Sequence, residues 1–519
     1  MIHFGFSYVG LLFFIMLFVP NLIWAKNKPK DYDKYVINEN KVLLMIERIG
    51  EATTLTAALI FSDYNLRAFT IWSLWLFLAF LFMVLYELYW IRYFRSGKTM
   101  ADMYSSYWGF PVAGASLPCL AFFCLGIYGT NIFLIVSALF LSVGHIGIHL
   151  NHRKEAVGKK KTKKIVKVIR VFLLIPVVLL LLVTVVAIAG RNINWFRFNT
   201  NTANGIDEMS YVEIGGQEQY IHIMGKDINN PVILYLHGGP AGPDSAIMPF
   251  FTDPLTGDYT VVCWDQRGCG RTYFHNAGND PDNLTVNFDT AVSDIDGMVD
   301  YLCERFNKDK VTLMCHSYGT IVGTRYVQEH SEKVEAYIGI GQFVNCRRSD
   351  ELAYENAMAA AKANGEDTSS LEEAYKTYCE GDSLKEYLML RNATSGYHPA
   401  ENKANTALLA VFCPYAGTDD VRWVMKQADL ESYEKLEGSL MDATYDYDVY
   451  DYELEYDIPM YFISGSMDYV CNTGLTKTFS EEITAPRSAF AVIEGGGHTP
   501  QYETPEAFGK LVKQMLKLS

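Results

Sequence analysis

A serine at position 317 stands in a pattern typical of an enzymatic nucleophile. The run Cys315-His316-Ser317-Tyr318-Gly319 follows a short β-rich stretch and opens a helical one. In this context a sharp turn exposes the serine hydroxyl, and small residues two places before and after it let the turn close. Cys315 takes the first of these places, where glycine is usual. The five residues alone are equally typical of a serine that begins a helix, so other residues must decide.

Two further residues supply the chemistry that Ser317 needs. His498 follows three glycines near the end of the chain, and Asp468 follows a β-rich stretch. A serine hydroxyl is a weak nucleophile until a base takes its proton, and an aspartate orients the imidazole and stabilises its charged form. The order serine, aspartate, histidine is that of α/β-hydrolases. We predict a triad of Ser317, Asp468 and His498. The competing acids, in a helical insert, are Asp419, Asp420 and Asp446.

A glycine-rich run is suited to bind a developing oxyanion. The segment 237–243, His-Gly-Gly-Pro-Ala-Gly-Pro, follows an early β-rich stretch. Its glycines allow backbone N–H groups to approach a negatively charged oxygen. We predict that a backbone N–H group of this run donates to the oxyanion, with the N–H group of Tyr318 as the second donor. The alternative is a plain Gly/Pro turn.

The elements that must position these residues alternate between strand and helix. A hairpin is expected at 209–224 around Gly215-Gly216, and a final helix at 505–518. The remaining predicted strands are 231–237, 259–265, 311–315, 334–340, 459–464 and 488–494. Alternation predicts a mostly parallel sheet flanked by helices. An insert at about 344–457, rich in Ala, Glu, Lys and Tyr, predicts a helical cap.

With these motifs in place, the second half of the chain resembles the proline iminopeptidase family of α/β-hydrolases. The resemblance is carried by segments 237–240, 264–271, 315–319, 337–342 and 498–501, and covers roughly Met209–Leu518 outside the cap. It implies the same triad, Gly239 as an oxyanion donor, and Arg267 as a residue that ties loops beside the pocket. Cys315 and Ala241 depart from the family pattern, and the cap has no motif that aligns.

Charge and hydropathy divide the chain into two parts. Residues 1–190 carry a net charge of +10 and long apolar runs, whereas residues 191–519 carry −25. We expect a membrane domain at 1–190 and a water-soluble α/β-hydrolase domain at 199–519. The acidic domain has no basic cluster and gives no reason to expect nucleic acid as a partner. The ten cysteines show no metal-binding spacing. Cys119 and Cys124 lie in an apolar run and should face lipid or the core, and we interpret the other eight as buried apolar residues, with a disulfide between two of them as the alternative.

Six apolar segments are candidate membrane spans. They are 6–25, 42–62, 69–91, 108–128, 131–150 and 168–189. Basic residues flank the cytoplasmic ends of spans, and all the basic groups, including 159–164 and the wider 153–170, can be cytoplasmic only if 42–62 also crosses. This topology predicts a multi-pass protein of the cell membrane with its hydrolase domain outside the cytoplasm. Alternatively, the first run is a signal peptide, or 42–62 is an interfacial helix. We expect Glu47, Arg48 and Glu51 to snorkel near the cytoplasmic end, although charges inside a membrane are often functional.

The expected activity is hydrolysis of short peptides or aminoacyl amides, without a cofactor or metal. A substrate ammonium would be held by one or two cap carboxylates. The candidates, most of which should face solvent, are Asp350, Glu351, Glu355, Glu366, Asp367, Glu372 and Glu373. The alternatives are a small-molecule carboxylesterase and a membrane sensor whose hydrolase-like domain binds a ligand. A third alternative, chemistry in the membrane half, receives little weight, because we recognise there no H-E-x-x-H motif and no Asp or His pair at helical spacing.

Overall fold

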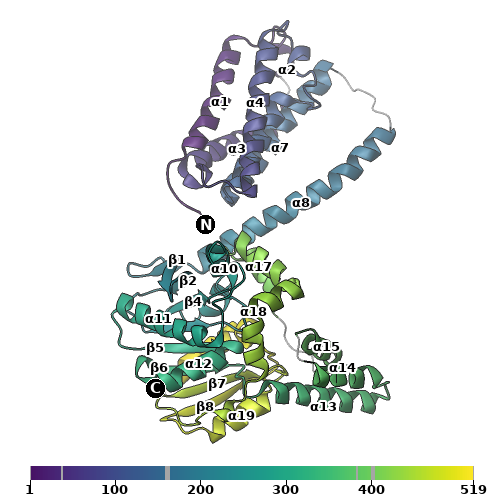
Figure 1. Cartoon of the computed structure of the whole chain (residues 1–519). Coiled ribbons are helices and arrows are strands. Elements are labelled where there is room, and N and C mark those ends of the chain that lie inside the picture. Colours follow the sequence, from purple (N-terminus) through teal and green to yellow (C-terminus); the bar gives the residue numbers. More distant parts are fainter. Residues whose placement is uncertain (1, 37–38, 158–163, 382–383, 399–403, 518–519) are drawn as a thin grey trace. The chain divides into compact units, whose positions relative to one another are not determined.

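The computed structural model describes residues 2–36, 39–157, 164–381, 384–398 and 404–517. The chain forms two compact units, Met1–Arg197 and Phe198–Ser519 (Figure 1). Of the basic stretch 159–164, on which the expected topology depends, only Lys164 is among the described residues.

In its described residues, unit 1 is built of helices and the turns between them. Its longer helices are α1 (Tyr8–Lys26), α3 (Lys41–Ile60), α4 (Leu74–Phe94), α6 (Ala113–Tyr128), α7 (Ile132–Val157) and α8 (Lys164–Arg197), joined by short α2 (Asp33–Val36) and α5 (Met100–Met103). Four segments are long and apolar enough to cross a bilayer, namely Tyr8–Lys26, Ile71–Phe94, Ile132–Val157 and Val178–Arg197. These four are compatible with a membrane-spanning N-terminal region.

The other two predicted spans differ from this group. Helix α6 begins at Ala113 and not at Trp108, because Trp108 and Gly109 have positive φ angles of 47° and 87° and form a turn. Thirteen of its sixteen residues are buried, so it is the central helix of the unit. Helix α3 exists as expected, but because of its charged residues it is not one of the four helices that are apolar enough to cross a bilayer. Whether it crosses a bilayer stays a prediction.

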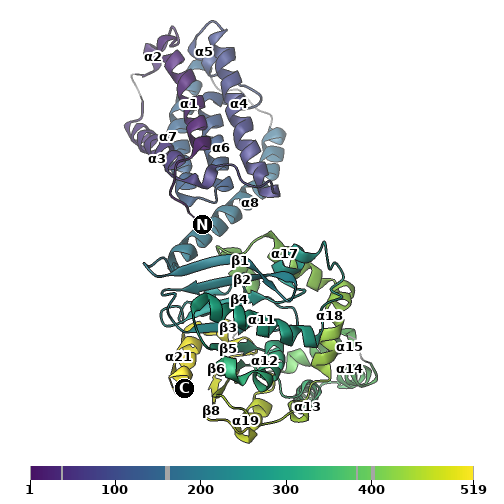
Figure 2. The ribbon, with the colours of Figure 1, turned by 60° about the vertical axis from the view of Figure 1, so that its left-hand side comes forward.

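Unit 2 is built on an eight-stranded sheet, and the predicted strands are confirmed to within a few residues. The strands are β1 (Ile206–Ile214), β2 (Gln217–Gly225), β3 (Val232–Leu236), β4 (Thr260–Asp265), β5 (Val311–His316), β6 (Val334–Ile340), β7 (Met460–Gly465) and β8 (Ser488–Ile493). Their spatial order is β1-β2-β4-β3-β5-β6-β7-β8, and Figure 2 labels all of these strands except β7. The β1–β2 hairpin pairs antiparallel with β4, and the strands from β4 to β8 are parallel.

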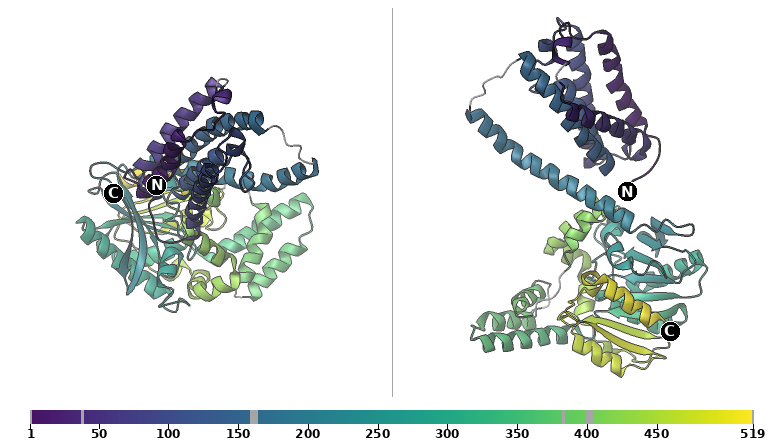
Figure 3. Two further views of the ribbon diagram at one scale, coloured as in Figure 1. Left: turned by 90° about the horizontal axis from the view of Figure 1, so that it is seen from above. Right: turned by 180° about the vertical axis from the view of Figure 1, so that it is seen from behind.

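Successive side chains of each strand point to opposite faces of this sheet, and helices cover both faces. Leu234 and Leu236 share one hydrophobic core with α11 (Phe288–Phe306) and α12 (Tyr318–Glu329). Ile233 and Tyr235 point to the other face, whose core includes Phe508 of α21 (Pro505–Leu516). Helix α21 lies across that face in the right-hand view of Figure 3. Burial on both sides explains why the central strands are apolar without alternation in the sequence.

The expected cap is a helical insert between β6 and β7. It comprises α13 (Cys346–Asn364), α14 (Ser369–Glu380), α15 (Leu384–Thr394), α16 (Thr406–Phe412), α17 (Thr418–Ala428) and α18 (Leu430–Tyr445). Helices α13 to α15 project from the sheet in Figure 1. Helices α17 and α18 instead pack on the segment that follows β3, as the contacts described below show.

Candidate active site

The turn after β5 gives Ser317 a strained backbone conformation. Its φ is 52° and its ψ −122°, a region that side-chain-bearing residues rarely adopt. The Ser317 N–H donates to the carbonyl oxygen of Ile340 at 3.0 Å, which ties the turn to the neighbouring strand β6. Helix α12 begins at the next residue, Tyr318. This is the strand–turn–helix arrangement expected around an exposed nucleophile.

Cys315, which replaces the usual glycine in this turn, has room for its side chain because α12 has a glycine, Gly323, opposite it. Cys315 is fully buried, and a Cβ on Gly323 would lie 2.5 Å from its Sγ. Gly319 is required for a different reason, since a Cβ there would lie 2.5 Å from the carbonyl oxygen of Leu236. Glycine at 319 and 323 therefore lets α12 pack closely against β3 and β5.

The three residues expected to form a triad lie together at the carboxyl ends of β5, β7 and β8. The Oγ of Ser317 is 3.0 Å from Nε2 of His498, and Nδ1 of His498 is 3.0 Å from Oδ2 of Asp468. The Asp468 side chain is fully buried. Its Oδ1 accepts from the N–H groups of Val470 and Cys471, both at 2.9 Å. A serine, a base and an orienting carboxylate thus stand in hydrogen-bonding sequence.

The competing acids are engaged elsewhere. Asp419 pairs with Arg422, Asp420 with Arg271, and Asp446 with Arg347. All three belong to the cap or its end, and each carboxylate forms an ion pair with an arginine. Asp468 is therefore the acid that the geometry favours.

The predicted oxyanion loop lies beside Ser317. A Cβ on Gly238 would come within 2.9 Å of Cβ of Ser317, so the loop approaches the nucleophile as closely as a glycine permits. Gly239 has a φ of 123°, which favours glycine. Tyr318 is the first residue of α12, and the N–H of such a residue has no acceptor within its own helix. The N–H groups of Gly239 and Tyr318 remain the proposed oxyanion donors.

Two residues that the sequence analysis missed position the His498 loop. Glu503, on α20 (Pro500–Glu503), accepts from the Gly497 N–H at 2.6 Å and from the Thr499 hydroxyl at 3.0 Å, one on each side of His498. His316 Nε2 lies 2.9 Å from the His498 carbonyl oxygen. Burial, with the nearby His498, lowers the pKa of His316 to about 3, so this ring stays neutral and donates. In the sequence, the signal for Glu503 was its position shortly after His498.

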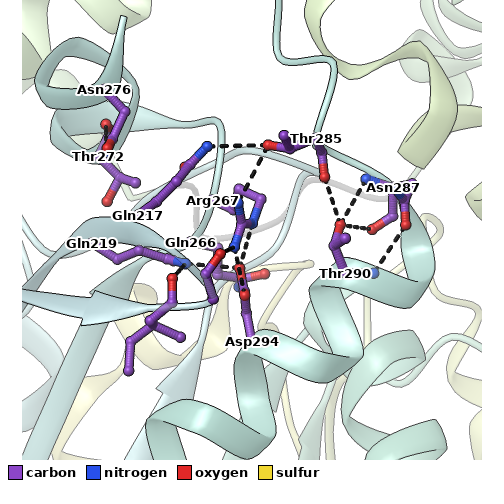
Figure 4. Close-up of polar contacts among 12 residues, drawn as sticks. Gln217, Gln219, Gln266, Arg267, Thr272, Asn276, Thr285, Asn287, Thr290 and Asp294 are labelled. Atoms are coloured by element: carbon purple, nitrogen blue, oxygen red, sulfur yellow. Dashed lines mark hydrogen bonds and ion pairs between the residues drawn. The ribbon is translucent and has the colours of Figure 1, made fainter. Parts of the chain in front are cut away.

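Arg267 ties loops together, as the family resemblance implied. Its Nε and Nη2 donate to the two oxygens of Asp294 on α11 at 2.6 and 2.8 Å, and Nη2 also donates to the Gly215 carbonyl at 2.8 Å (Figure 4). Gln219 donates to the same carboxylate at 2.7 Å. This buried bidentate pair joins the β1–β2 hairpin, the loop after β4 and α11.

The cap contributes a buried carboxylate, although not one of those expected. Glu437 on α18 is fully buried. Its Oε1 accepts from Asn283 at 2.9 Å, whereas Oε2 has no partner among the described residues. Burial raises the pKa of Glu437 well above its usual value, despite the Asn283 hydrogen bond. The hydroxyl of Tyr318, the residue after the nucleophile, is also buried without a partner in the described part of the chain.

Neighbouring residues of the cap hold the oxyanion loop. Trp423 Nε1 and Gln427 Nε2 both donate to the Ala241 carbonyl at 2.9 Å, and the Tyr433 hydroxyl donates to the Pro240 carbonyl at 2.5 Å. Because Tyr433 lies one helical turn before Glu437, both residues are on the face of α18 that contacts this loop.

The acidic residues that we expected in this role lie elsewhere in the cap. Asp350 is buried, but it pairs with Arg391 and accepts from Tyr378. Glu351 is partly exposed and pairs with Arg348. The other five are exposed, as expected for most of them: Glu355, Glu366, Asp367, Glu372 and Glu373.

In unit 1 the expectation of no histidine pair at helical spacing is wrong. His145 and His149 are four residues apart on α7, and together with Glu47 of α3 they form a group whose ligand atoms lie within 4.8 Å of one another. Nor does Glu47 simply extend toward the end of its helix, since its carboxylate contacts His145. The spacing of the two histidines was visible in the sequence; their partner on α3 was not.

Comparison with known proteins agrees with this architecture. Residues 231–505 match the family model described as the alpha/beta hydrolase fold. The chain is 24% identical over 306 residues to the probable aminopeptidase YbaC of Bacillus subtilis, covering 59% of this chain and 95% of that protein. It is 31% identical over 119 residues to a proline iminopeptidase of Neisseria gonorrhoeae, covering 23% and 34% of the two chains.

Solved structures also align with about 60% of this chain. A proline iminopeptidase-related protein from Thermus thermophilus aligns at 21% identity with a TM-score of 0.42, over 60% of this chain and 98% of that one. A proline iminopeptidase from Mycobacterium smegmatis aligns at 18% identity with a TM-score of 0.43, over the same shares. The family model alone spans more than half of the sequence, and the chain belongs to the alpha/beta hydrolase fold family.

Proposed function

We propose that residues 199–519 form a serine hydrolase that removes N-terminal residues from short peptides or aminoacyl amides. The observation that carries the proposal is the continuous hydrogen-bonded line from Ser317 Oγ through His498 to the buried carboxylate of Asp468. The names of the relatives, probable aminopeptidase and proline iminopeptidase, support the choice of substrate class.

The proposed mechanism proceeds through an acyl-enzyme. His498 Nε2 takes the proton of Ser317 as Oγ attacks the substrate carbonyl carbon, and Asp468 stabilises the resulting imidazolium. The N–H groups of Gly239 and Tyr318 stabilise the oxyanion that forms. His498 then protonates the leaving amine, and the C–N bond breaks. Water attacks the ester carbonyl in the same way, with His498 as base, which releases the acid and restores Ser317.

Selection of a free amine is assigned to Glu437. This buried carboxyl has an unpartnered oxygen among the described residues, and its helix α18 holds the oxyanion loop through Tyr433. An ammonium group beside Glu437 would lower its raised pKa and pair with the ionised form. An acylated amine would leave the carboxyl buried and unpaired, at a cost of about 1–3 kcal/mol in binding or more for a charged group.

Features of unit 1 support a proposal for where in the cell the hydrolase acts. Its apolar helices would anchor the hydrolase to the cell membrane, and the basic residues from Arg153 onward, before α8, would keep the start of that helix in the cytoplasm. The domain would then act outside the cytoplasm. No nucleic acid is expected as a partner.

A fluorophosphonate probe tests the nucleophile. The purified full chain should be labelled, whereas Ser317→Ala should lose both labelling and turnover with an unchanged melting temperature. Ser466→Ala, a serine on the adjacent loop, is the matched control and should be labelled normally. Absence of labelling in the folded wild type would instead favour a ligand-binding sensor domain.

The substrate class is tested by comparing a substrate that has a free amine with the same substrate after its amine is acetylated. Proline β-naphthylamide should be hydrolysed faster than its N-acetyl form and faster than a neutral short-chain acyl ester. Glu437→Gln should abolish this preference, and Glu355→Gln, which alters an exposed cap carboxylate, should preserve it. Equal or higher rates on the blocked amide or the ester would overturn the aminopeptidase proposal and favour a carboxylesterase with the same triad.

A further inference from the structure

Three potential metal ligands converge between two helices of unit 1. Glu47 lies on α3, and His145 and His149 occupy successive turns of α7. One ligand atom from each residue lies within 4.8 Å of the other two. The Glu47 carboxylate contacts Nδ1 of His145 directly, and the two imidazole rings have centroids 4.5 Å apart. Two imidazoles and a carboxylate are a donor set that binds zinc and related dications.

The backbone holds these ligands in register. A Cβ on Gly144 would lie 2.3 Å from the backbone nitrogen of Glu47, and a Cβ on Gly50 would lie 2.4 Å from that of Leu141. Glycine at these positions lets the backbones of α3 and α7 approach closely at Glu47 and one turn beyond it. The carboxylate and the imidazoles therefore project from two adjacent, closely packed helices, which is the rigid support that a metal site requires.

A second set of residues orients His149. The Tyr104 hydroxyl lies 2.9 Å from Nδ1 of His149 and 3.2 Å from Nδ1 of His152. Nε2 of His152 in turn lies 3.5 Å from a carboxylate oxygen of Glu39. One hydroxyl can accept from the first ring and donate to the second. In that arrangement Nδ1 of His149 carries the proton, and its Nε2 keeps the lone pair that a metal needs.

The simpler explanation, a hydrogen-bonded Glu–His pair, covers only part of these observations. It accounts for Glu47 and His145. It does not account for a second imidazole on the same side, whose other nitrogen is held by a relay of Tyr104, His152 and Glu39. Partners of this kind, which fix the tautomer of a ligating histidine, are characteristic of metal sites.

We propose that Glu47, His145 and His149 bind one divalent transition-metal ion of the zinc class, supported by Tyr104, His152 and Glu39. Three protein ligands leave a fourth position for water or another small ligand. The ion would cross-link α3 to α7 and neutralise the Glu47 charge within an apolar unit. Neither the hydrolase motifs nor the family of unit 2 requires this site.

The test is a metal titration of the full chain in detergent, purified with a tag that lacks histidine and stripped with a chelator. Wild type should bind one equivalent of Zn²⁺ in competition with a chromophoric chelator, and Co²⁺ should give visible d–d absorption. Glu47→Gln and His149→Gln should lose both signals. Tyr104→Phe should weaken Zn²⁺ binding about 10- to 100-fold, as expected for a residue that orients a ligand.

His3→Gln is the matched control, because His3 also pairs with a carboxylate of unit 1, Asp63, and the two belong to no group of three potential ligands among the described residues. It should bind Zn²⁺ like wild type. Monodisperse elution and a cooperative thermal unfolding transition report folding of each variant. A folded wild type that binds less than half an equivalent overturns the proposal whatever the variants do, and so does equal binding by wild type and His149→Gln.

Discussion

Asp468 combines two roles in one carboxylate. Oδ1 accepts two backbone N–H groups, from Val470 and Cys471, and Oδ2 faces His498. An asparagine at 468 can keep the first set with its oxygen, so the loop should stay folded. Its NH₂ group would then face Nδ1 of His498 and favour the tautomer that cannot accept the Ser317 proton.

We therefore expect Asp468→Asn to lower kcat by ~10³-fold or more with little change in KM or melting temperature. Steady-state kinetics on the preferred amide, with thermal unfolding, checks this. Asp446→Asn alters an exposed competing acid and should keep near-wild-type kcat. Near-full activity of Asp468→Asn would show that another residue is the acid.

The buried carboxyl of Glu437 predicts a pH-dependent stability difference. Its folded-state pKa is raised above the ordinary value of 4.5 by burial, so the folded state holds the proton more tightly than the unfolded state does. Its contribution to stability is present in full below pH about 4.5 and is lost as the pH rises toward the folded pKa. Glutamine does not titrate and keeps the contact with Asn283.

The melting temperature of Glu437→Gln minus that of wild type should therefore increase from about pH 5 to about pH 8. Thermal unfolding of both proteins across this range measures the difference. Glu355→Gln, at an exposed site, should show no such trend. A difference that falls with rising pH would contradict a raised pKa at Glu437.

At the scale of elements, the packing of α12 on β5 depends on a pair of small residues. The sulfur of Cys315 occupies the space that a Cβ on Gly323 would enter, at 2.5 Å. Alanine is ordinarily favoured over glycine in a helix by about 1 kcal/mol. Here the clash should dominate, because overpacking a buried site typically costs about 1–3 kcal/mol.

Gly323→Ala should accordingly lower the free energy of unfolding of unit 2 by about 1–3 kcal/mol. The same change in a Cys315→Ala background, which lacks the sulfur, should be neutral or stabilising. A double-mutant cycle from thermal or denaturant unfolding measures this coupling. Additive effects of the two substitutions would mean that Cys315 and Gly323 do not compete for space.

For the molecule as a whole, charge and hydropathy separate along the chain. Unit 1 holds the apolar helices, and residues 191–519 carry the excess of acidic groups. With the basic residues before α8 in the cytoplasm, the hydrolase should be reached by protease added to intact cells or spheroplasts. Protection of unit 2 until the membrane is lysed would reverse the proposed topology. A cytoplasmic marker protein, intact in the same sample, controls for lysis.

Most of unit 2 could be predicted from sequence because its determinants are local. Strands and helices follow from short-range hydrophobic patterns, and the strand–turn–glycine segments around Ser317, Asp468 and His498 identify residues at strand ends. The Gly215-Gly216 turn is another such case, since both residues adopt the positive φ angles that the sequence implies. In unit 1 the start of α6 was misplaced, because apolar composition does not reveal the turn at Trp108 and Gly109.

Contacts between distant segments were decided by the tertiary structure alone. Glu437 is one of many cap carboxylates in the sequence, and only its burial against Asn283, 154 residues away, distinguishes it from the solvent-exposed ones. Glu47 and His145 are 98 residues apart and meet because α3 and α7 pack through glycines. A side chain's burial and partners depend on which helix lies across from it, and hydrophobic periodicity specifies a buried face without naming its neighbour.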